Sequence, residues 1–237
     1  MRKFKFPDYT KVIVFLTVMN LIIMTIRNWY VDNTVFNFLW RNLWSSFCPL
    51  LVATLMVVFN SKINKFFFWI GCFVWLIFYP NAPYMISDLI HNSLDPSKIP
   101  NQIIYDTIII FSIAMLSLFY GFISMKIIFN LIFSRYNKIV ANAAITVTLI
   151  LSSVGFYMGR LLASGIPYGN GLLYSWELFI HPIVVLKVVW HALFPIGQHV
   201  PDYLLMLLFG IVQYMVMIMM KDVSNVQNVE VSDTSAN

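Results

Sequence analysis

Two short segments of the chain combine a carboxylate and an imidazole at helical spacing. Asp88 and His91 lie three residues apart, and Glu177 and His181 lie four residues apart. On a helix, residues at these spacings share one face, so each pair could transfer a proton or supply two metal ligands. The alternative for Asp88 and His91 is a solvated polar face without a chemical role. No metal or other cofactor follows from these spacings alone, so the cofactors stay unknown.

Four more side chains near these segments are candidates for substrate binding: Asn81, Tyr84, Arg160 and Trp176. The planar guanidinium of Arg160 suits a carboxylate or a phosphate, although this side chain could instead extend toward lipid headgroups. Asp106 and Asp202 stand near the start of apolar segments. We interpret both as residues at helix N-termini, where a carboxylate interacts favourably with the helix dipole.

The composition defines the surroundings in which such side chains would work. Of the 237 residues, 60% are hydrophobic and only 11% are charged, and the mean hydropathy is +0.79. Soluble domains average about 45–50% apolar and about 25% charged residues, and a soluble chain could not cover this much apolar surface. The composition therefore excludes soluble enzymes and disordered linkers. It also excludes nucleic-acid binders, because the basic residues lie beside apolar segments and form no basic stripe.

Six apolar segments predict membrane-spanning helices. Their approximate ranges are 12–30, 42–60, 66–79, 103–133, 139–162 and 201–220. Only helices fit these segments, because the alternation of a barrel strand is absent and lipid tolerates no unpaired backbone. The predicted fold class is all-α. A single polytopic transmembrane helix bundle of about six spans occupies residues 1–221, and a disordered cytoplasmic tail follows at 222–237.

Two further segments, 84–94 and 176–194, are predicted to be short interfacial helices on the extracytoplasmic side. Lys187 would lie in mid-bilayer if 176–194 crossed the membrane, at a cost of roughly 2.5–3.5 kcal/mol. A helix lying on the interface avoids this cost, although a seventh span stays the alternative. Within 139–162, small residues recur at steps of three and four, a pattern that allows close helix packing in lipid. They are Ala144, Thr148, Ser152, Gly155 and Gly159.

Pro80 and Pro83 are predicted to end the segment 66–79, because proline lacks a backbone donor and disfavours helix at the preceding residue. Broken backbone at membrane depth requires protein or water around it. Residues 81–84 therefore lie either in a pocket near the outer leaflet or in an ordinary proline-rich loop. The sequence leaves both alternatives open.

The distribution of Lys and Arg predicts the orientation in the membrane. Ten of the 15 basic residues fall on one side, which is then the cytoplasmic side and holds both termini. All four histidines fall on the opposite side, together with Asp88, Asp106 and Glu177. Any chemistry is therefore expected at the extracytoplasmic face.

The segment YPNAPYMISDLIH resembles the signature of the domain of unknown function 1361 family, a group of bacterial multi-pass membrane proteins. In that signature a Pro-Asn-Ala-Pro-Tyr core precedes an aspartate and a histidine, which are Asp88 and His91 in this chain. A second family block has Gly-Arg and then Asn-Ser-Trp-Asp. Gly159, Arg160, Ser175 and Trp176 match it, whereas Tyr174 replaces the asparagine and Glu177 the aspartate. The resemblance implies the bacterial cytoplasmic membrane and no known activity.

Three functions stay open at this point. The first is an extracytoplasmic polar site that processes or binds an envelope or lipid-linked substrate, with a carboxylate–histidine pair for proton transfer. The second is a non-catalytic scaffold or an accessory subunit of another membrane protein. A transporter component is a third function, against which the absence of an inverted repeat argues. The expected partners are the lipid bilayer and either a lipid-linked substrate or a membrane protein.

Overall fold

The structure, a computed structural model, describes residues 8–30, 37–89, 100–160 and 207–218, and the single residues 183, 190 and 204. Every regular element in these ranges is a helix, which confirms the predicted all-α fold class. The elements are α1 (Asp8–Tyr30), α2 (Asn37–Val58), α3 (Lys65–Phe78), α4 (Asn81–Tyr84), the 3₁₀ helix η2 (Met85–Leu89), α6 (Pro100–Arg135) and α7 (Lys138–Arg160). A shorter apolar helix, Leu207–Ile218, follows near the C-terminus.

Five helical stretches among the described residues are long and apolar enough to cross a membrane, in agreement with the prediction of a membrane protein. They are Thr10–Trp29, Leu39–Val58, Lys65–Leu89, Ile103–Arg135 and Lys138–Phe156. The third stretch continues ten residues beyond Tyr79, at which the predicted span ended. The predicted segment 201–220 contains helix Leu207–Ile218, which is too short to count among the five.

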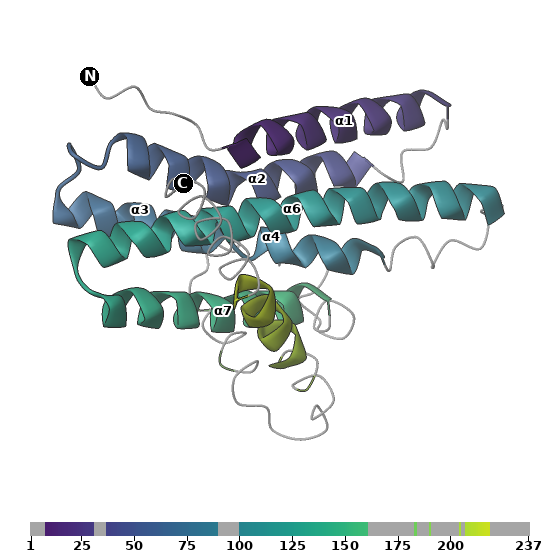
Figure 1. Cartoon of the computed structure of the whole chain (residues 1–237). Coiled ribbons are helices and arrows are strands. Elements are labelled where there is room, and N and C mark those ends of the chain that lie inside the picture. Colours follow the sequence, from purple (N-terminus) through teal and green to yellow (C-terminus); the bar gives the residue numbers. More distant parts are fainter. Residues whose placement is uncertain are drawn as a thin grey trace, which may run out of the picture. The chain divides into compact units, whose positions relative to one another are not determined.

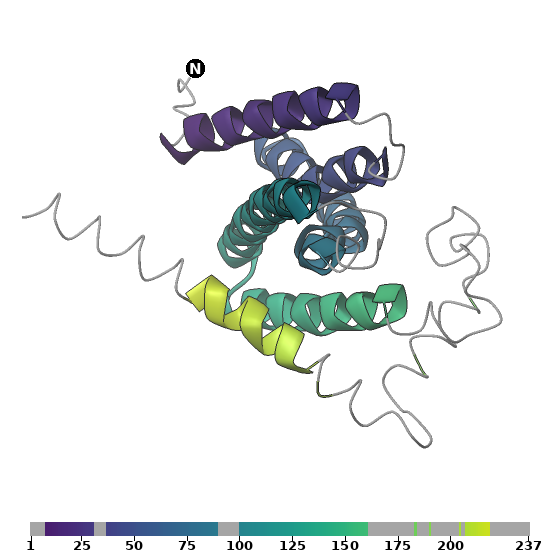
Figure 2. The ribbon, with the colours of Figure 1, turned by 90° about the vertical axis from the view of Figure 1, so that its right-hand side faces the viewer.

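The chain divides into two compact units, Met1–Asn142 and Ala143–Asn237. In the first unit α6 is the central element, because α1, α2, α4 and η2 all pack against it (Figure 1). The view turned by 90° shows α1 above α6 and α2 beside it (Figure 2). Of the apolar stretch in α6, 61% is buried, against 17% in α1, so α6 forms the core and α1 lies at the periphery.

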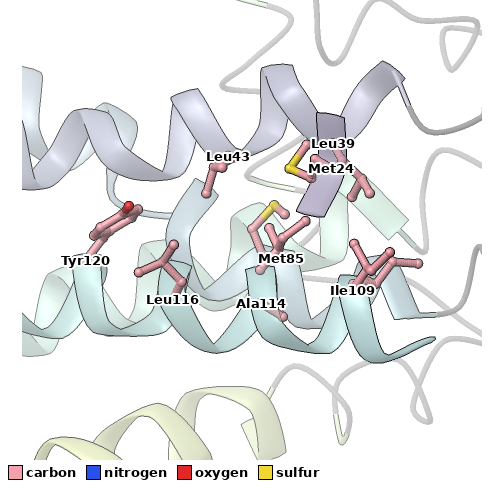
Figure 3. Close-up of a cluster of buried hydrophobic side chains, with 10 residues drawn as sticks. Met24, Leu39, Leu43, Met85, Ile109, Ala114, Leu116 and Tyr120 are labelled. Carbon is pink, nitrogen blue, oxygen red and sulfur yellow. The ribbon is translucent and has the colours of Figure 1, made fainter. Parts of the chain in front are cut away.

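One apolar cluster joins four of these elements around the first half of α6 (Figure 3). α1 contributes Met24, α2 contributes Leu39 and Leu43, and η2 contributes Met85. All four side chains are at most 5% exposed, so they are closely packed between the helices. The α6 members are Ile109, Ile110, Ile113, Ala114, Leu116 and Tyr120.

Small and hydroxylated residues on the second half of α6 allow close contact with its neighbours. The hydroxyls of Ser117 and Ser46 on α2 lie 2.8 Å apart, and the Trp75 indole Nε1 on α3 donates to Ser124 Oγ at 3.1 Å. A Cβ at Gly121 would lie 2.9 Å from the Cβ of Ala82 on α4. Small residues and hydroxyl groups hold helices together in lipid, where the hydrophobic effect cannot.

In the second unit, α7 packs against helix Leu207–Ile218 through similar residues. Ser152 Oγ lies 3.1 Å from Gln213 Oε1, and the rings of Phe156 and Phe209 stack with their centroids 4.3 Å apart. Gly210 lies so close to α7 that an added Cβ would be 2.7 Å from Ser153 Oγ. Ser152 is one of the small residues predicted to permit close packing, and the structure confirms this role for it.

We predict that Gly121→Ala lowers the free energy of unfolding by about 1–3 kcal/mol, because the new methyl group overpacks the contact with Ala82, which has no flexible side chain. Gly71→Ala is the matched control, since its new methyl group would meet only the thioether end of Met56, which can move. Thermal unfolding in detergent measures both changes. Equal losses in the two variants would contradict this account of the α4–α6 contact.

Candidate functional site

The structure describes three of the predicted site residues in detail: Asn81 and Tyr84 on α4, and Asp88 on η2. Arg160 ends α7, but its side chain lies outside the described part. His91, Trp176, Glu177 and His181 also lie outside the described residues. The predicted convergence of the two motifs on one site therefore stays a prediction.

The two prolines are accommodated in helical turns, so the alternative of an ordinary loop is wrong for residues 81–84. Because the Ala82 N–H donates to Tyr79 O at 3.1 Å, the carbonyl of Phe78 loses its usual helical donor. The side-chain amide of Asn81 replaces that donor at 3.0 Å. The motif thus interrupts the regular helix at Tyr79 and Pro80 while the carbonyl of Phe78 stays hydrogen-bonded.

Asp88 lies inside the protein in η2, at the end of this helical stretch. Only 1% of the residue is exposed, and Asn42 Nδ2 on α2 donates to Asp88 Oδ2 at 2.9 Å. The alternative of a solvated polar face is therefore wrong for Asp88. Burial of a carboxylate is costly unless donors stabilise it, and the amide of Asn42 is one such donor.

A second buried carboxylate, Asp106, lies near the start of α6. Arg27 on α1 donates to it through two nitrogens, with distances of 2.9 Å and 3.2 Å. The two side chains are only 7% and 2% exposed. The interpretation of Asp106 as an N-terminal residue is wrong, because α6 begins at Pro100 and its first turn contains no acidic residue. The carboxylate instead joins two helices through a bidentate ion pair, the strongest hydrogen-bonding geometry of arginine.

A small cavity of about 10 Å³ lies beside this ion pair. Its lining residues are Met24, Arg27, Asn28, Leu39, Asp106 and Ile109. This volume is near the minimum that one water molecule requires, so the cavity has no room for a substrate. The ion pair therefore has a structural role in the described part of the protein.

The two buried carboxylates lie close to the same apolar cluster. Asp88 is three residues from Met85, and Asp106 is three residues from Ile109. Figure 3 shows Met85 and Ile109 in this cluster together with Met24 and Leu39. The described residues contain no group of three His, Cys, Asp or Glu side chains that could hold a metal ion. What they provide is a buried, oriented carboxylate at Asp88.

Sequence reasoning missed the partners of both carboxylates. Asn42 was available as a signal, because an amide in an apolar segment commonly joins membrane helices by hydrogen bonds. Arg27 lies within the predicted span 12–30, in the last turn of α1, but the spacing of residues did not indicate that it pairs with Asp106. Periodicity within one segment identifies a face of a helix but not the helix that this face contacts. Asn42 and Asp88 are 46 residues apart in the sequence, and Arg27 and Asp106 are 79 residues apart.

We predict that Arg27→Met lowers the free energy of unfolding by about 3–5 kcal/mol, because it leaves the Asp106 carboxylate buried without its cation. Arg27→Met combined with Asp106→Leu should recover most of this loss, since neither charge of the pair then stays buried. Arg41→Met, at an exposed arginine on α2, is the control and should change little. Thermal unfolding in detergent distinguishes the variants, and a single variant as stable as the wild type would contradict the structural role.

Comparison with known proteins gives one match. A family model described as a protein of unknown function (DUF1361) matches residues 40–216, which include Asp88 and Asp106 and leave out α1. A search of curated proteins gives no match, and a search of solved structures gives none either. The match confirms the resemblance that the segment YPNAPYMISDLIH indicates.

Proposed function

The chain belongs to the DUF1361 family of proteins of unknown function, and we propose that it serves an extracytoplasmic site in the bacterial cytoplasmic membrane. At this site it would bind or process an envelope or lipid-linked substrate. The observation that carries the proposal is the buried carboxylate of Asp88, held by the amide of Asn42 at 2.9 Å. Ionisable residues inside membrane proteins are expensive and commonly mark functional sites.

The distribution of charge supports the orientation in this proposal. Lys62 lies in the turn between α2 and α3, and Lys65 begins α3. Arg135 ends α6 and Lys138 begins α7, so basic residues also flank the turn between these two helices. Asp88 and Asp106 lie toward the opposite ends of the helices that these turns connect. Since basic turns stay in the cytoplasm, the two buried carboxylates are then near the extracytoplasmic surface.

We predict that a reporter fused after Lys65 is cytoplasmic. A phosphatase, which is active only outside the cytoplasm, should be inactive at this position, whereas a fluorescent protein that folds only in the cytoplasm should fluoresce. The same pair of reporters fused within residues 31–36, between α1 and α2, should give the opposite result. An active phosphatase after Lys65 would overturn the orientation.

Asp88 is suited to the role of a general base or acid because its position is fixed before a substrate binds. The amide of Asn42 donates to one carboxylate oxygen and so orients the carboxylate. In the proposal His91 is its proton-transfer partner, and Glu177 and His181 form the second pair. Arg160 would hold an anionic group of the substrate. Asn81, Tyr84 and Trp176 are the further candidates for substrate binding.

We predict that Asp88→Asn abolishes function without loss of the fold. An asparagine at position 88 still accepts from Asn42, so the hydrogen bond survives and only the charge disappears. The double variant Asn42→Asp with Asp88→Asn keeps the hydrogen bond but moves the carboxylate to α2, and it should be equally inactive. The measurement is complementation of a deletion strain, scored by envelope-stress resistance and by mass spectrometry of accumulated envelope intermediates, at matched protein abundance.

A non-catalytic scaffold or accessory subunit is the second candidate, and the ion pair between Arg27 and Asp106 favours it. That pair is internal, and the cavity beside it has room for about one water molecule. In a scaffold, the carboxylate of Asp88 would serve packing alone. Full complementation by Asp88→Asn at normal abundance would therefore support the scaffold and contradict the proposed site.

A further inference from the structure

The chain uses one five-residue pattern twice at the same end of the first unit. Residues 61–65 are Ser-Lys-Ile-Asn-Lys, and residues 134–138 are Ser-Arg-Tyr-Asn-Lys. Each copy leads into a helix whose first residue is the final lysine, Lys65 for α3 and Lys138 for α7. We call these two segments the paired basic turns.

Both asparagines of the pattern have the same structural role. Asn64 Oδ1 accepts from the N–H of Phe67 at 3.0 Å, and Asn137 Oδ1 accepts from the N–H of Val140 at 2.9 Å. Each asparagine thus caps the following helix, and it fixes where the neighbouring lysine leaves the backbone. The cap satisfies one backbone N–H of each helix N-terminus, and the exposed lysine side chains beside it are the charged groups that a ligand would meet.

Direct contacts between side chains hold the two turns side by side. Trp69 Nε1 on α3 donates to Tyr136 Oη at 2.8 Å. The guanidinium of Arg135 donates to Asn60 Oδ1 at 2.7 Å and to Ile63 O at 3.2 Å, and it lies 4.4 Å from the ring centroid of Phe68. Arg135 is thereby used to fasten the first turn to the end of α6, which is the end shown on the left of Figure 1.

The remaining cations of the paired basic turns are free to face a ligand. Lys62, Lys65 and Lys138 are all exposed. No aspartate or glutamate occurs in residues 33–87 or in residues 107–176, so neither segment brings an acid to these lysines. The positive charge at this end is therefore concentrated and is not neutralised by the segments that carry it.

Large apolar side chains are exposed directly beside these lysines. Phe66 is 69% exposed, Trp69 is 41% exposed and Ile139 is 79% exposed. They lie at the ends of helices that are long and apolar enough to cross a membrane. A ligand that suits this surface therefore needs an anionic group for the lysines and hydrocarbon chains for the apolar side chains.

We propose that the paired basic turns bind the phosphate headgroup of an anionic phospholipid, with its acyl chains along Phe66 and Ile139. Clustered Lys and Arg side chains at the end of membrane helices are suited to such headgroups. Trp and Tyr favour the same depth of the bilayer, so the pair formed by Trp69 and Tyr136 is placed beside the phosphate. This site lies at the other end of the helices from Asp88, and it does not depend on the proposed function.

The test is native mass spectrometry of the full-length protein in detergent with equal amounts of phosphatidylglycerol and phosphatidylcholine of identical acyl chains. The wild type should retain phosphatidylglycerol preferentially. Lys62→Gln, Lys65→Gln and Lys138→Gln combined should reduce this preference by roughly a hundredfold, because each cation contributes about fivefold. The control combines Lys11→Gln, Arg41→Gln and Lys126→Gln, which removes three exposed cations elsewhere and should keep the preference.

Three results would overturn the proposal. The first is an unchanged preference in the triple variant, provided that its thermal unfolding matches the wild type. The second is an equal loss in the control variant, since this would reflect total charge and not the paired basic turns. The third is displacement of phosphatidylglycerol by millimolar inorganic phosphate, which would show a site for free phosphate and not for a lipid.

Discussion

A polar group buried among membrane helices must find its hydrogen-bond partner within the protein, because lipid offers none. In the first unit α6 supplies such partners to side chains of α1, α2 and α3. Tyr120 contacts Thr17 on α1 at 2.6 Å, Ser117 contacts Ser46 on α2, and Ser124 accepts from Trp75 on α3. With 36 residues, or about 54 Å at 1.5 Å per residue, α6 reaches both ends of the bundle. It connects the buried ion pair at one end to the paired basic turns at the other.

The hydrogen bonds along α6 change in character from one end to the other. Near its start Asp106 forms an ion pair, in its middle the contacts are between neutral hydroxyl and indole groups, and Arg135 at its end binds carbonyl oxygens. Neutral contacts in the middle are consistent with the high cost of charge at the bilayer centre. The apolar cluster and the contact of Gly121 with Ala82 then add packing that only small residues permit. The proline motif thus depends on α6 as much as on its own sequence.

The fold class followed from composition, because a soluble fold could not bury the apolar surface of a chain in which 60% of the residues are hydrophobic. The end of the regular helix before Pro80 also followed from the chemistry of proline, because α3 ends at Phe78. The continuation into α4 and η2 did not follow, because it requires the amide of Asn81 to satisfy the carbonyl of Phe78. It also requires Gly121, which lies 39 residues from Ala82 in sequence. Long-range pairing of this kind leaves no trace in the periodicity of a single segment.

The contrast between local residue chemistry and long-range pairing also explains which parts of the candidate site were predictable. The identity of Asp88 as a residue of interest came from its spacing to His91, but its burial came only with the placement of Asn42. A guanidinium forms an ion pair with the carboxylate of Asp106, and the amide of Asn42 donates to the carboxylate of Asp88. The first arrangement joins α1 to α6 and needs no substrate to account for it. The second fixes the direction of one carboxylate oxygen, a form of preorganisation that a proton-transfer site requires. Asp88, which also has helical spacing to His91, is therefore the centre of the proposed site.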